Sequence, residues 1–409
     1  MSTRPAHLSP PDDETGHTPW VRLALALSLG AAVSLGITRF AYGLLLPPMR
    51  EDLGWSYTLA GGMNTANALG YLLGALATPV LMRRGSPSGV LLVGALLASL
   101  FMAASGFFTA AVPLLLQRLL AGVASAFVFI AGGLLAARLG ARQPHRSGLL
   151  LGLYYGGTGL GIVASALGVP VALAAAHDQP HAWTWAWWAL ALLCLLATLV
   201  MRWPARVLAR LEAAAPAGSD RSQGARVFRV RDFAFGLAGY MGFGVGYIGY
   251  MTFVIALLRE QGTSPLAITA FYTLLGLAVV ASSRIWAGLL DRHRDGQALA
   301  RLNALLGVAA ILPALTSAWP LMLASGLLFG AVFLSVVAST TALVRHNLPP
   351  SQWAAGISAF TIIFAAGQIV GPTVVGLIAD GPGGLARGLV FSACSLWVGA
   401  VLATRQRAL

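Results

Sequence analysis

Long apolar runs alternate with short polar segments along most of the chain. Each run has about twenty or more residues, enough for a helix that rises 1.5 Å per residue to cross a hydrocarbon core of about 30 Å. The pattern therefore predicts an all-α membrane protein with twelve transmembrane helices. The runs lie at about 20–46, 57–82, 87–109, 111–138, 147–175, 183–202, 233–258, 265–290, 298–317, 320–344, 353–379 and 386–404.

Composition supports the burial of these runs in lipid. Hydrophobic residues make up 57% of the chain and charged residues 10%, whereas about a quarter of a soluble domain is charged. The 48 glycines recur inside the runs. There they allow close approach of helix backbones in a membrane, where apolar burial does not drive helices together.

The formal net charge of +13 is a balance that nucleic-acid-binding proteins share. All 26 basic residues are arginine, however, and most lie in the short gaps between runs. We therefore expect a lipid bilayer and no nucleic acid as partner. Because arginine-rich loops stay in the cytoplasm, we predict a bacterial inner (plasma) membrane protein with both termini cytoplasmic. These loops hold Arg83, Arg84, Arg138, Arg142, Arg146, Arg202, Arg206, Arg210, Arg292, Arg294, Arg301, Arg345, Arg405 and Arg407.

The longest polar gap divides the runs into two sets of six. Residues 1–19 are polar, which predicts a disordered cytoplasmic tail. Residues 20–202 then form an N-terminal six-helix half and residues 232–405 a C-terminal half. Residues 203–231, rich in arginine, alanine and proline, are the predicted cytoplasmic linker between the halves.

One loop motif is similar to a signature of the major facilitator superfamily. Gly-Leu-Leu-Asp-Arg-His-Arg at 288–294 resembles that signature in its second-half copy. The first-half counterpart at 82–85 keeps the basic residues and lacks the aspartate. Such an aspartate can pair with an arginine or a helix N-terminus of the other half and hold one face shut. We therefore predict gating roles for Asp291, Arg292, Arg83 and Arg84.

Two further motifs resemble helices of the same superfamily. Arg-Leu-Leu-Ala-Gly at 118–122 is similar to its fourth helix, and Gly-Gln-Ile-Val-Gly-Pro at 367–372 to a glycine–proline packing signature. Close helix contact and a local bend are the structural consequences of these residue types. We predict that Arg118, Gly371 and Pro372 take part in conformational change.

The segment 36–56, together with Asn64 and Asn67, resembles the N-terminal signature of the YbfB/YjiJ-like branch of this superfamily. The resemblance implies the major facilitator fold, with two pseudo-symmetric six-helix halves and a substrate site between them near mid-bilayer. It also implies transport by alternating access. That branch is known mainly as predicted transporters, so the resemblance does not identify a substrate.

Three arginines fall well inside apolar runs, at Arg39, Arg118 and Arg284, whereas all thirteen acids fall in tails, loops or helix ends. A charge at mid-bilayer costs about 2.5–3.5 kcal/mol, so these side chains should face a wet cavity or a partner. Without a buried carboxylate, a substrate anion is the natural partner, because the planar guanidinium binds both carboxylate oxygens. The position of Arg284 resembles that of the arginine that meets the substrate carboxylate in oxalate/formate antiporters and monocarboxylate transporters.

The sequence thus predicts a secondary active transporter of a small organic anion, a mono- or dicarboxylate. Its predicted substrate-binding residues are Arg39, Arg284, Tyr42, Asn64, Asn67, Tyr155, Tyr247 and Gln368. In a purely structural alternative, Arg118 donates to backbone carbonyls and Arg284 pairs with Asp291. Trp183, Trp185, Trp187 and Trp188 are interpreted as anchors at the membrane interface.

Other functional classes fit the sequence less well. The histidines and the two cysteines have no metal-ligand spacing, and no phosphate-binding glycine loop follows a strand. We therefore predict no enzyme activity, no metal and no cofactor, and we expect a monomer. An efflux pump for drugs, a carrier of neutral metabolites such as sugars and a non-transporting receptor remain alternatives. Proton coupling is left open, since the apolar runs contain no acidic side chain or histidine.

Overall fold

The computed structural model describes residues 19–213 and 227–409. The predicted tail therefore lies outside the described residues, except for Pro19, and so does the middle of the predicted linker. The described residues contain twelve helical spans that are long and apolar enough to cross a membrane. This confirms the predicted number of spans.

Two sets of helices follow the two predicted halves. The first contains α1 (Trp20–Ala31), the π-helical η1 (Ala32–Phe40), α2 (Tyr42–Leu53), α3 (Tyr57–Arg84), α4 (Pro87–Ser105), α5 (Ala111–Ala141), the short η2 (Pro144–Arg146), α6 (Ser147–Ala175) and α7 (Trp183–Ala213). The second contains η3 (Val230–Phe233), α8 (Ala234–Glu260), α9 (Pro265–Ile285), α10 (Ala287–Arg292), α11 (Gln297–Leu315), α12 (Trp319–Asn347), α13 (Pro350–Ala379) and α14 (Gly384–Thr404).

Two of the differences between the predicted runs and the helices have a clear physical reason or a visible break. Helix α7 continues to Ala213, beyond the predicted end of the first half at 202. Its extension is amphipathic, with Arg206 exposed and Leu208 buried, so charged residues that suggest a loop instead form the wet face of a helix. The run predicted at 265–290 is interrupted at Trp286, where α9 ends before α10 begins.

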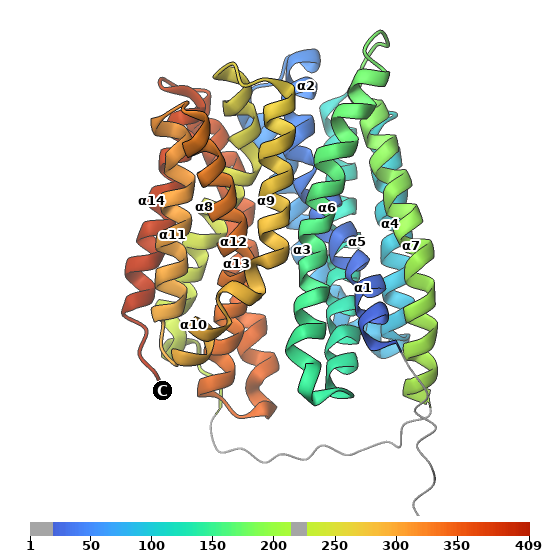
Figure 1. The fold of residues 1–409 in the computed structure, drawn as a ribbon, viewed down its shortest axis with the longest axis vertical. Coiled ribbons are helices and arrows are strands. Elements are labelled where there is room, and N and C mark those ends of the chain that lie inside the picture. Colours follow the sequence, from blue (N-terminus) through green and yellow to red (C-terminus); the bar gives the residue numbers. More distant parts are fainter. Residues whose placement is uncertain (1–18, 214–226) are drawn as a thin grey trace, which may run out of the picture.

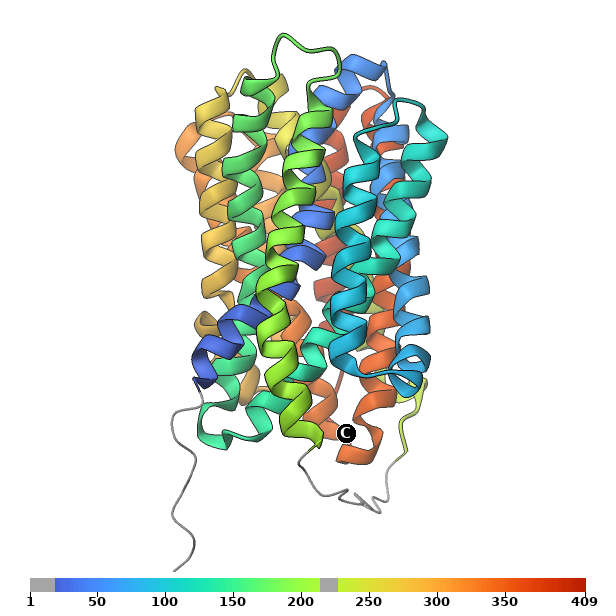
Figure 2. The same ribbon diagram turned by 90° about the vertical axis from the view of Figure 1, so that its right-hand side faces the viewer.

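The helices lie along the long axis of the molecule and form two bundles side by side (Figure 1). The turned view shows the helices of one bundle in front of the other (Figure 2). Because the spans alternate in direction, one end of the molecule holds the start of α1, the end of α3 and the C-terminus. We call this the Arg84 end; the opposite end, where α2 and α13 finish, is the Asp380 end.

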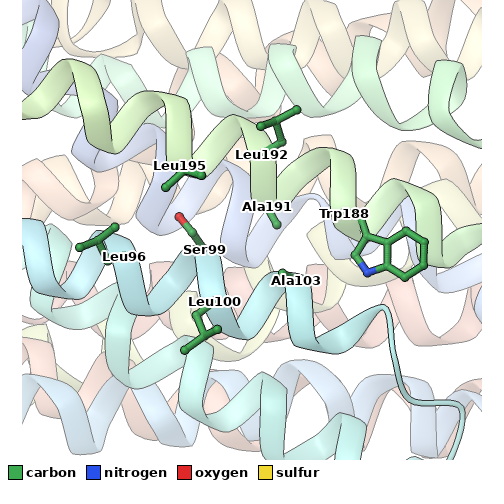
Figure 3. A pocket seen from close by; sticks show the side chains of 8 residues that line it. All are labelled: Leu96, Ser99, Leu100, Ala103, Trp188, Ala191, Leu192 and Leu195. Atoms are coloured by element: carbon green, nitrogen blue, oxygen red, sulfur yellow. The ribbon is translucent and has the colours of Figure 1, made fainter.

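The outer surface carries many exposed large apolar side chains, such as Leu76 (58% exposed) and Leu100 (59% exposed). Between α4 and α7 lies a groove of about 360 Å³ (Figure 3), where the only side-chain oxygen is that of Ser99. That hydroxyl donates to the carbonyl of Ala95 at 2.9 Å. A groove with this lining suits hydrocarbon better than a polar solute. The groove is lined by Leu96, Ser99, Leu100, Ala103, Trp188, Ala191, Leu192 and Leu195.

Close contact between α3 and α5 gives a test of the packing. A Cβ added to Gly70 would lie 1.9 Å from the carbonyl oxygen of Leu119, whereas a Cβ at Gly62, on the same helix, would meet nothing within 4 Å. We expect Gly70→Ala to lower the apparent melting temperature of the purified protein in detergent. Gly62→Ala should leave it unchanged or raise it, because alanine is favoured over glycine within helices by about 1 kcal/mol. Equal effects of the two substitutions would contradict this packing.

Candidate functional site

Two arginines are buried in the centre of the bundle. Arg39 and Arg118 are each 2% exposed, and they are the only charged side chains among the described residues that are buried. No carboxylate accompanies them, because the described Asp and Glu side chains with a burial class are exposed or intermediate. Their guanidinium groups are therefore hydrogen-bonded to neutral groups of the protein.

Arg39, at the end of the π-helical segment, is held by side-chain amides. Its Nε donates to Oδ1 of Asn67 at 3.0 Å, and its Nη1 donates to Oε1 of Gln368. The guanidinium carbon lies 4.7 Å from the centroid of the Tyr71 ring. Its Nη2 has no hydrogen-bond acceptor. One nitrogen of this guanidinium is thus left without a partner in a buried position.

Arg118 has a similar environment. Its Nη1 donates to the carbonyl oxygen of Thr38 at 2.7 Å, and its Nη2 donates to Oδ1 of Asn64 at 2.9 Å. The rings of Tyr42 and Trp187 lie 5.0 and 5.6 Å from its guanidinium carbon. Its Nε has no acceptor. The structural alternative raised for Arg118, donation to a backbone carbonyl, accounts for part of these contacts.

The amides that hold the arginines also connect the two halves. Asn64 donates to the hydroxyl of Thr252 on α8 at 2.8 Å. Gln368 on α13 accepts from Arg39 and, at 2.8 Å, from the hydroxyl of Tyr247. Its Nε2 has no acceptor. We name Arg39, Arg118, Asn64, Asn67, Gln368 and Tyr247 the Arg39 cluster.

The unpartnered atoms of this cluster are all donors. They are Nη2 of Arg39, Nε of Arg118 and Nε2 of Gln368. A buried donor without an acceptor costs about 1–3 kcal/mol, and more when it is charged. An arrangement of this kind is suited to a solute that brings oxygen acceptors.

The structure therefore brings together five of the eight predicted substrate-binding residues and adds Arg118, predicted to act in gating. Tyr42 also lies beside this cluster, because its ring faces Arg118 and its hydroxyl donates to the carbonyl of Ala60 at 2.8 Å. Tyr155, 36% exposed on α6, packs instead against Phe129, with ring centroids 5.7 Å apart.

Arg284 differs from its predicted position. Its side chain is exposed near the end of α9, so it is not a buried charge and does not share the environment of Arg39. No ion pair joins it to Asp291 among the described side chains. The physical reason is that α9 ends one residue later, at Ile285, so that Arg284 occupies a helix end rather than the middle of a span.

Three neighbours of the cluster were not predicted as site residues. Tyr71 follows Asn67 by four residues on α3, a spacing that puts both on one helix face. Thr252 gives no local signal, because its contact with Asn64 joins different halves. Trp187, interpreted from sequence as an interfacial anchor, is instead 1% exposed and faces Arg118. Trp183 is likewise 1% exposed, and its Nε1 donates to Asp52 at 2.6 Å.

A second set of contacts joins the halves at the Asp380 end. The carboxylate of Asp380 accepts from the backbone N–H of Tyr57 at 2.7 Å and of Thr58 at 2.8 Å, and from the Thr58 hydroxyl at 2.6 Å. Tyr57 begins α3, so the carboxylate meets the positive end of a helix dipole. The hydroxyl of Tyr57 donates to Glu260, which ends α8.

The other predicted gating residues are in three different situations. Pro372 lies between the halves, because a Cβ on Gly61 of α3 would be 2.2 Å from its carbonyl oxygen. Gly371 packs within its own half, against the carbonyl of Val245. Arg83, Arg84, Asp291 and Arg292 are exposed at the Arg84 end. Between described side chains, no ion pair joins the halves there.

Comparison with known proteins identifies the family. The family model described as "Uncharacterised MFS-type transporter YbfB" matches residues 31–404. A search of curated protein sequences gives no match.

Solved structures share the fold. The chain is similar to the nucleoside transporter NupG, with 13% identity, coverage of 95% of this chain and 100% of that chain, and a TM-score of 0.66. A bacterial homologue of the human lysosomal transporter Spinster, inward-facing and occupied, shares 15% identity. The match covers 95% of this chain and 97% of that chain, with a TM-score of 0.67. The human organic anion transporter MFSD10 shares 16% identity, and the match covers 95% of this chain and 100% of that chain, with a TM-score of 0.61. At these identities the likeness concerns the fold, and it confirms the predicted major facilitator architecture.

The contacts of Asp380 predict a measurable effect on the closure of that end. Thr373 donates to or accepts from Thr65 of the other half at 2.8 Å. In a chain with Cys394→Ser and Thr373→Cys, we expect Asp380→Asn to accelerate labelling of the new cysteine by an impermeant maleimide several-fold. The reason is loss of the charged cap on α3. Asp178→Asn is the matched control, because Asp178 is exposed and pairs with His177 of its own half. Equal labelling rates in both variants would contradict the claim that the Asp380 carboxylate holds the two halves together at this end.

The pKa of Asp380 sets the pH range in which its carboxylate holds the two halves together. Desolvation raises the pKa, but hydrogen bonds from Thr58 and Tyr57 and the charge of Arg50 outweigh it, so the pKa lies below its ordinary value. Because the pKa is lowered, the stabilisation by the Asp380 carboxylate is fully present above the ordinary pKa of an aspartate, about 3.9. It is lost when the pH falls through the still lower pKa of Asp380 in the folded protein. We expect the ratio of labelling rates, Asp380→Asn over parent, to be equal at pH 5.5 and 7.5.

Proposed function

The chain belongs to the family of uncharacterised MFS-type transporters represented by YbfB, and we propose that it moves a small organic anion across the membrane by alternating access. Membership makes it a multi-pass membrane transporter of a small molecule, in a superfamily whose members are generally not enzymes. The substrate class is our proposal. It covers mono- and dicarboxylates.

One observation carries the proposal: two buried guanidinium groups have neutral partners alone and leave donors unpaired. Arg39 Nη2 and Gln368 Nε2 belong to side chains that are already joined to each other. A carboxylate has two oxygens with lone pairs for such donors, and charge-assisted bonds of this kind are about twice as strong as neutral ones. The substrate would supply the negative charge that the bundle lacks.

The position of the cluster supports a role in alternating access. Arg39 and Gln368 belong to different halves, as do Asn64 and Thr252. When the halves separate at this level, these bonds must break. A bound anion can replace them, because it offers new acceptors to the same donors. Hydrogen bonds to the solute would thus replace hydrogen bonds between the halves.

The arginine-rich loops favour an orientation with the Arg84 end in the cytoplasm. In that orientation, in a bacterial inner membrane, the Asp380 end, where hydrogen bonds join the halves, faces outward. We propose a monomer, because each chain contains both halves of the cluster. Proton movement would have to use the substrate carboxylate or a group near the ends of the spans, such as Asp52, Asp232, Glu260 or Asp291. Exchange of anions or uniport needs no such group.

A neutral polar solute, such as a sugar, is the alternative that the structure favours next. Asn64, Asn67 and Gln368 are amide side chains that bind hydroxyl groups well. Export of cationic drugs fits less well, because the buried part of the described chain contains no carboxylate. The names of NupG and MFSD10 point to different solute classes, so likeness of fold does not decide between them.

Substitution of Arg39 tests the anion assignment. In proteoliposomes that take up labelled mono- and dicarboxylates, we expect Arg39→Gln to raise the apparent KM at least about tenfold, since a charge-assisted bond contributes about 1.5–3 kcal/mol. Arg39→Lys should retain part of the activity. Arg284→Ala is the control, because this exposed arginine is absent from the cluster. Uptake of carboxylates unchanged by Arg39→Gln, or uptake of a sugar with no carboxylate uptake, would contradict the assignment.

A further inference from the structure

Four aromatic rings of the second half form one parallel stack. Tyr240, Phe243 and Tyr247 belong to α8, and Phe364 belongs to α13. Ring centroids in contact lie 4.7–5.4 Å apart, and the ring planes are inclined by 10–21°. This offset parallel arrangement is one of the two that the charge distribution of aromatic rings favours. Phe333 extends the stack beyond Tyr247, at 5.2 Å and 23°.

Tyr247 joins the stack to the Arg39 cluster. The hydroxyl of Tyr247 donates to Gln368, which in turn accepts from Arg39. Phe364 precedes Gln368 by four residues on α13, so the two side chains lie on one face, one helical turn apart. Phe364 is partly exposed, whereas Phe243 and Tyr247 are buried. Phe364 is therefore the one member of the stack that the protein does not fully cover.

A ring of the first half also lies beside Arg39. Tyr71 of α3 faces the guanidinium at 4.7 Å, and it belongs to the first half, whereas the stack belongs to the second. The unpaired Nη2 of Arg39 and Nε2 of Gln368 thus lie in surroundings rich in flat π surfaces. These donors indicate where the carboxylate of a solute would bind. The partly exposed Phe364 indicates that an aromatic ring would suit the rest of that solute.

We propose that the transported anion is an aromatic carboxylate, whose carboxylate meets Arg39 and Gln368 and whose ring extends the stack at Phe364. This inference rests on the proposed function and narrows its substrate class. A planar ring gains contact with a parallel stack that a puckered aliphatic ring of similar size cannot match. From the strength of aromatic pairs, the preference is about two- to tenfold in Kd.

Three ligands of similar size separate charge from aromaticity. Calorimetric titration of the purified full-length protein with benzoate, cyclohexanecarboxylate and benzamide should give the tightest binding for benzoate. Cyclohexanecarboxylate, which keeps the charge and lacks the planar ring, should bind about two- to tenfold more weakly. Benzamide, which keeps the ring and lacks the charge, should bind at least about tenfold more weakly.

Substitution of Phe364 locates the preference. Phe364→Leu should bring the Kd values of benzoate and cyclohexanecarboxylate together, whereas Phe364→Tyr, which keeps the ring, should retain the preference. Phe391→Leu on α14 is the matched control, because this phenylalanine is also partly exposed and contributes no ring to the stack. It should change neither Kd.

The outcomes distinguish this inference from the proposed function. Equal binding of the two carboxylates by the unsubstituted protein, or a preference for benzoate that survives Phe364→Leu, would overturn the aromatic assignment and leave the anion proposal standing. Benzamide binding as tightly as benzoate, or no binding of either carboxylate, would overturn both.

Discussion

The burial of two positive charges without a buried carboxylate is the constraint on which this structure depends. Arg39 and Arg118 lie within spans whose outer surface is apolar, where a charge costs about 2.5–3.5 kcal/mol. The bundle offsets this cost with amide oxygens, a backbone carbonyl and the faces of aromatic rings. These partners are neutral, so the centre of the molecule keeps its positive charge.

The partners of the buried arginines also join the two halves. The amides that satisfy the arginines belong to helices of both halves, so the polar centre also holds them together. At the Asp380 end, a carboxylate of one half meets the first turn of a helix of the other. Both interactions are made of hydrogen bonds whose partners can change, as alternating access requires. In the groove between α4 and α7, by contrast, the side-chain oxygen of Ser99 bonds within its own helix.

Much of the candidate site could be predicted from the residue types alone. Arg39, Asn64, Asn67 and Gln368 are polar residues inside long apolar runs, and their burial has a cost that makes a shared polar centre the favourable solution. Arg284 shows the limit of this argument. It also interrupts an apolar run, but the helix ends beside it, and the side chain reaches the surface. Sequence spacing does not reveal where within a run the helix breaks.

The sequence by itself determined the twelve spans, their division into halves and the clustering of arginines in alternate loops, because these follow from local hydrophobicity and charge. The tertiary structure decided which polar groups meet. The pairing of Asn64 with Thr252, of Asp380 with the start of α3, and of Gln368 with Arg39 joins residues up to 329 positions apart. Such contacts depend on how two bundles dock, and docking is set by the packing of whole helix faces. Local sequence patterns do not determine how the two bundles dock.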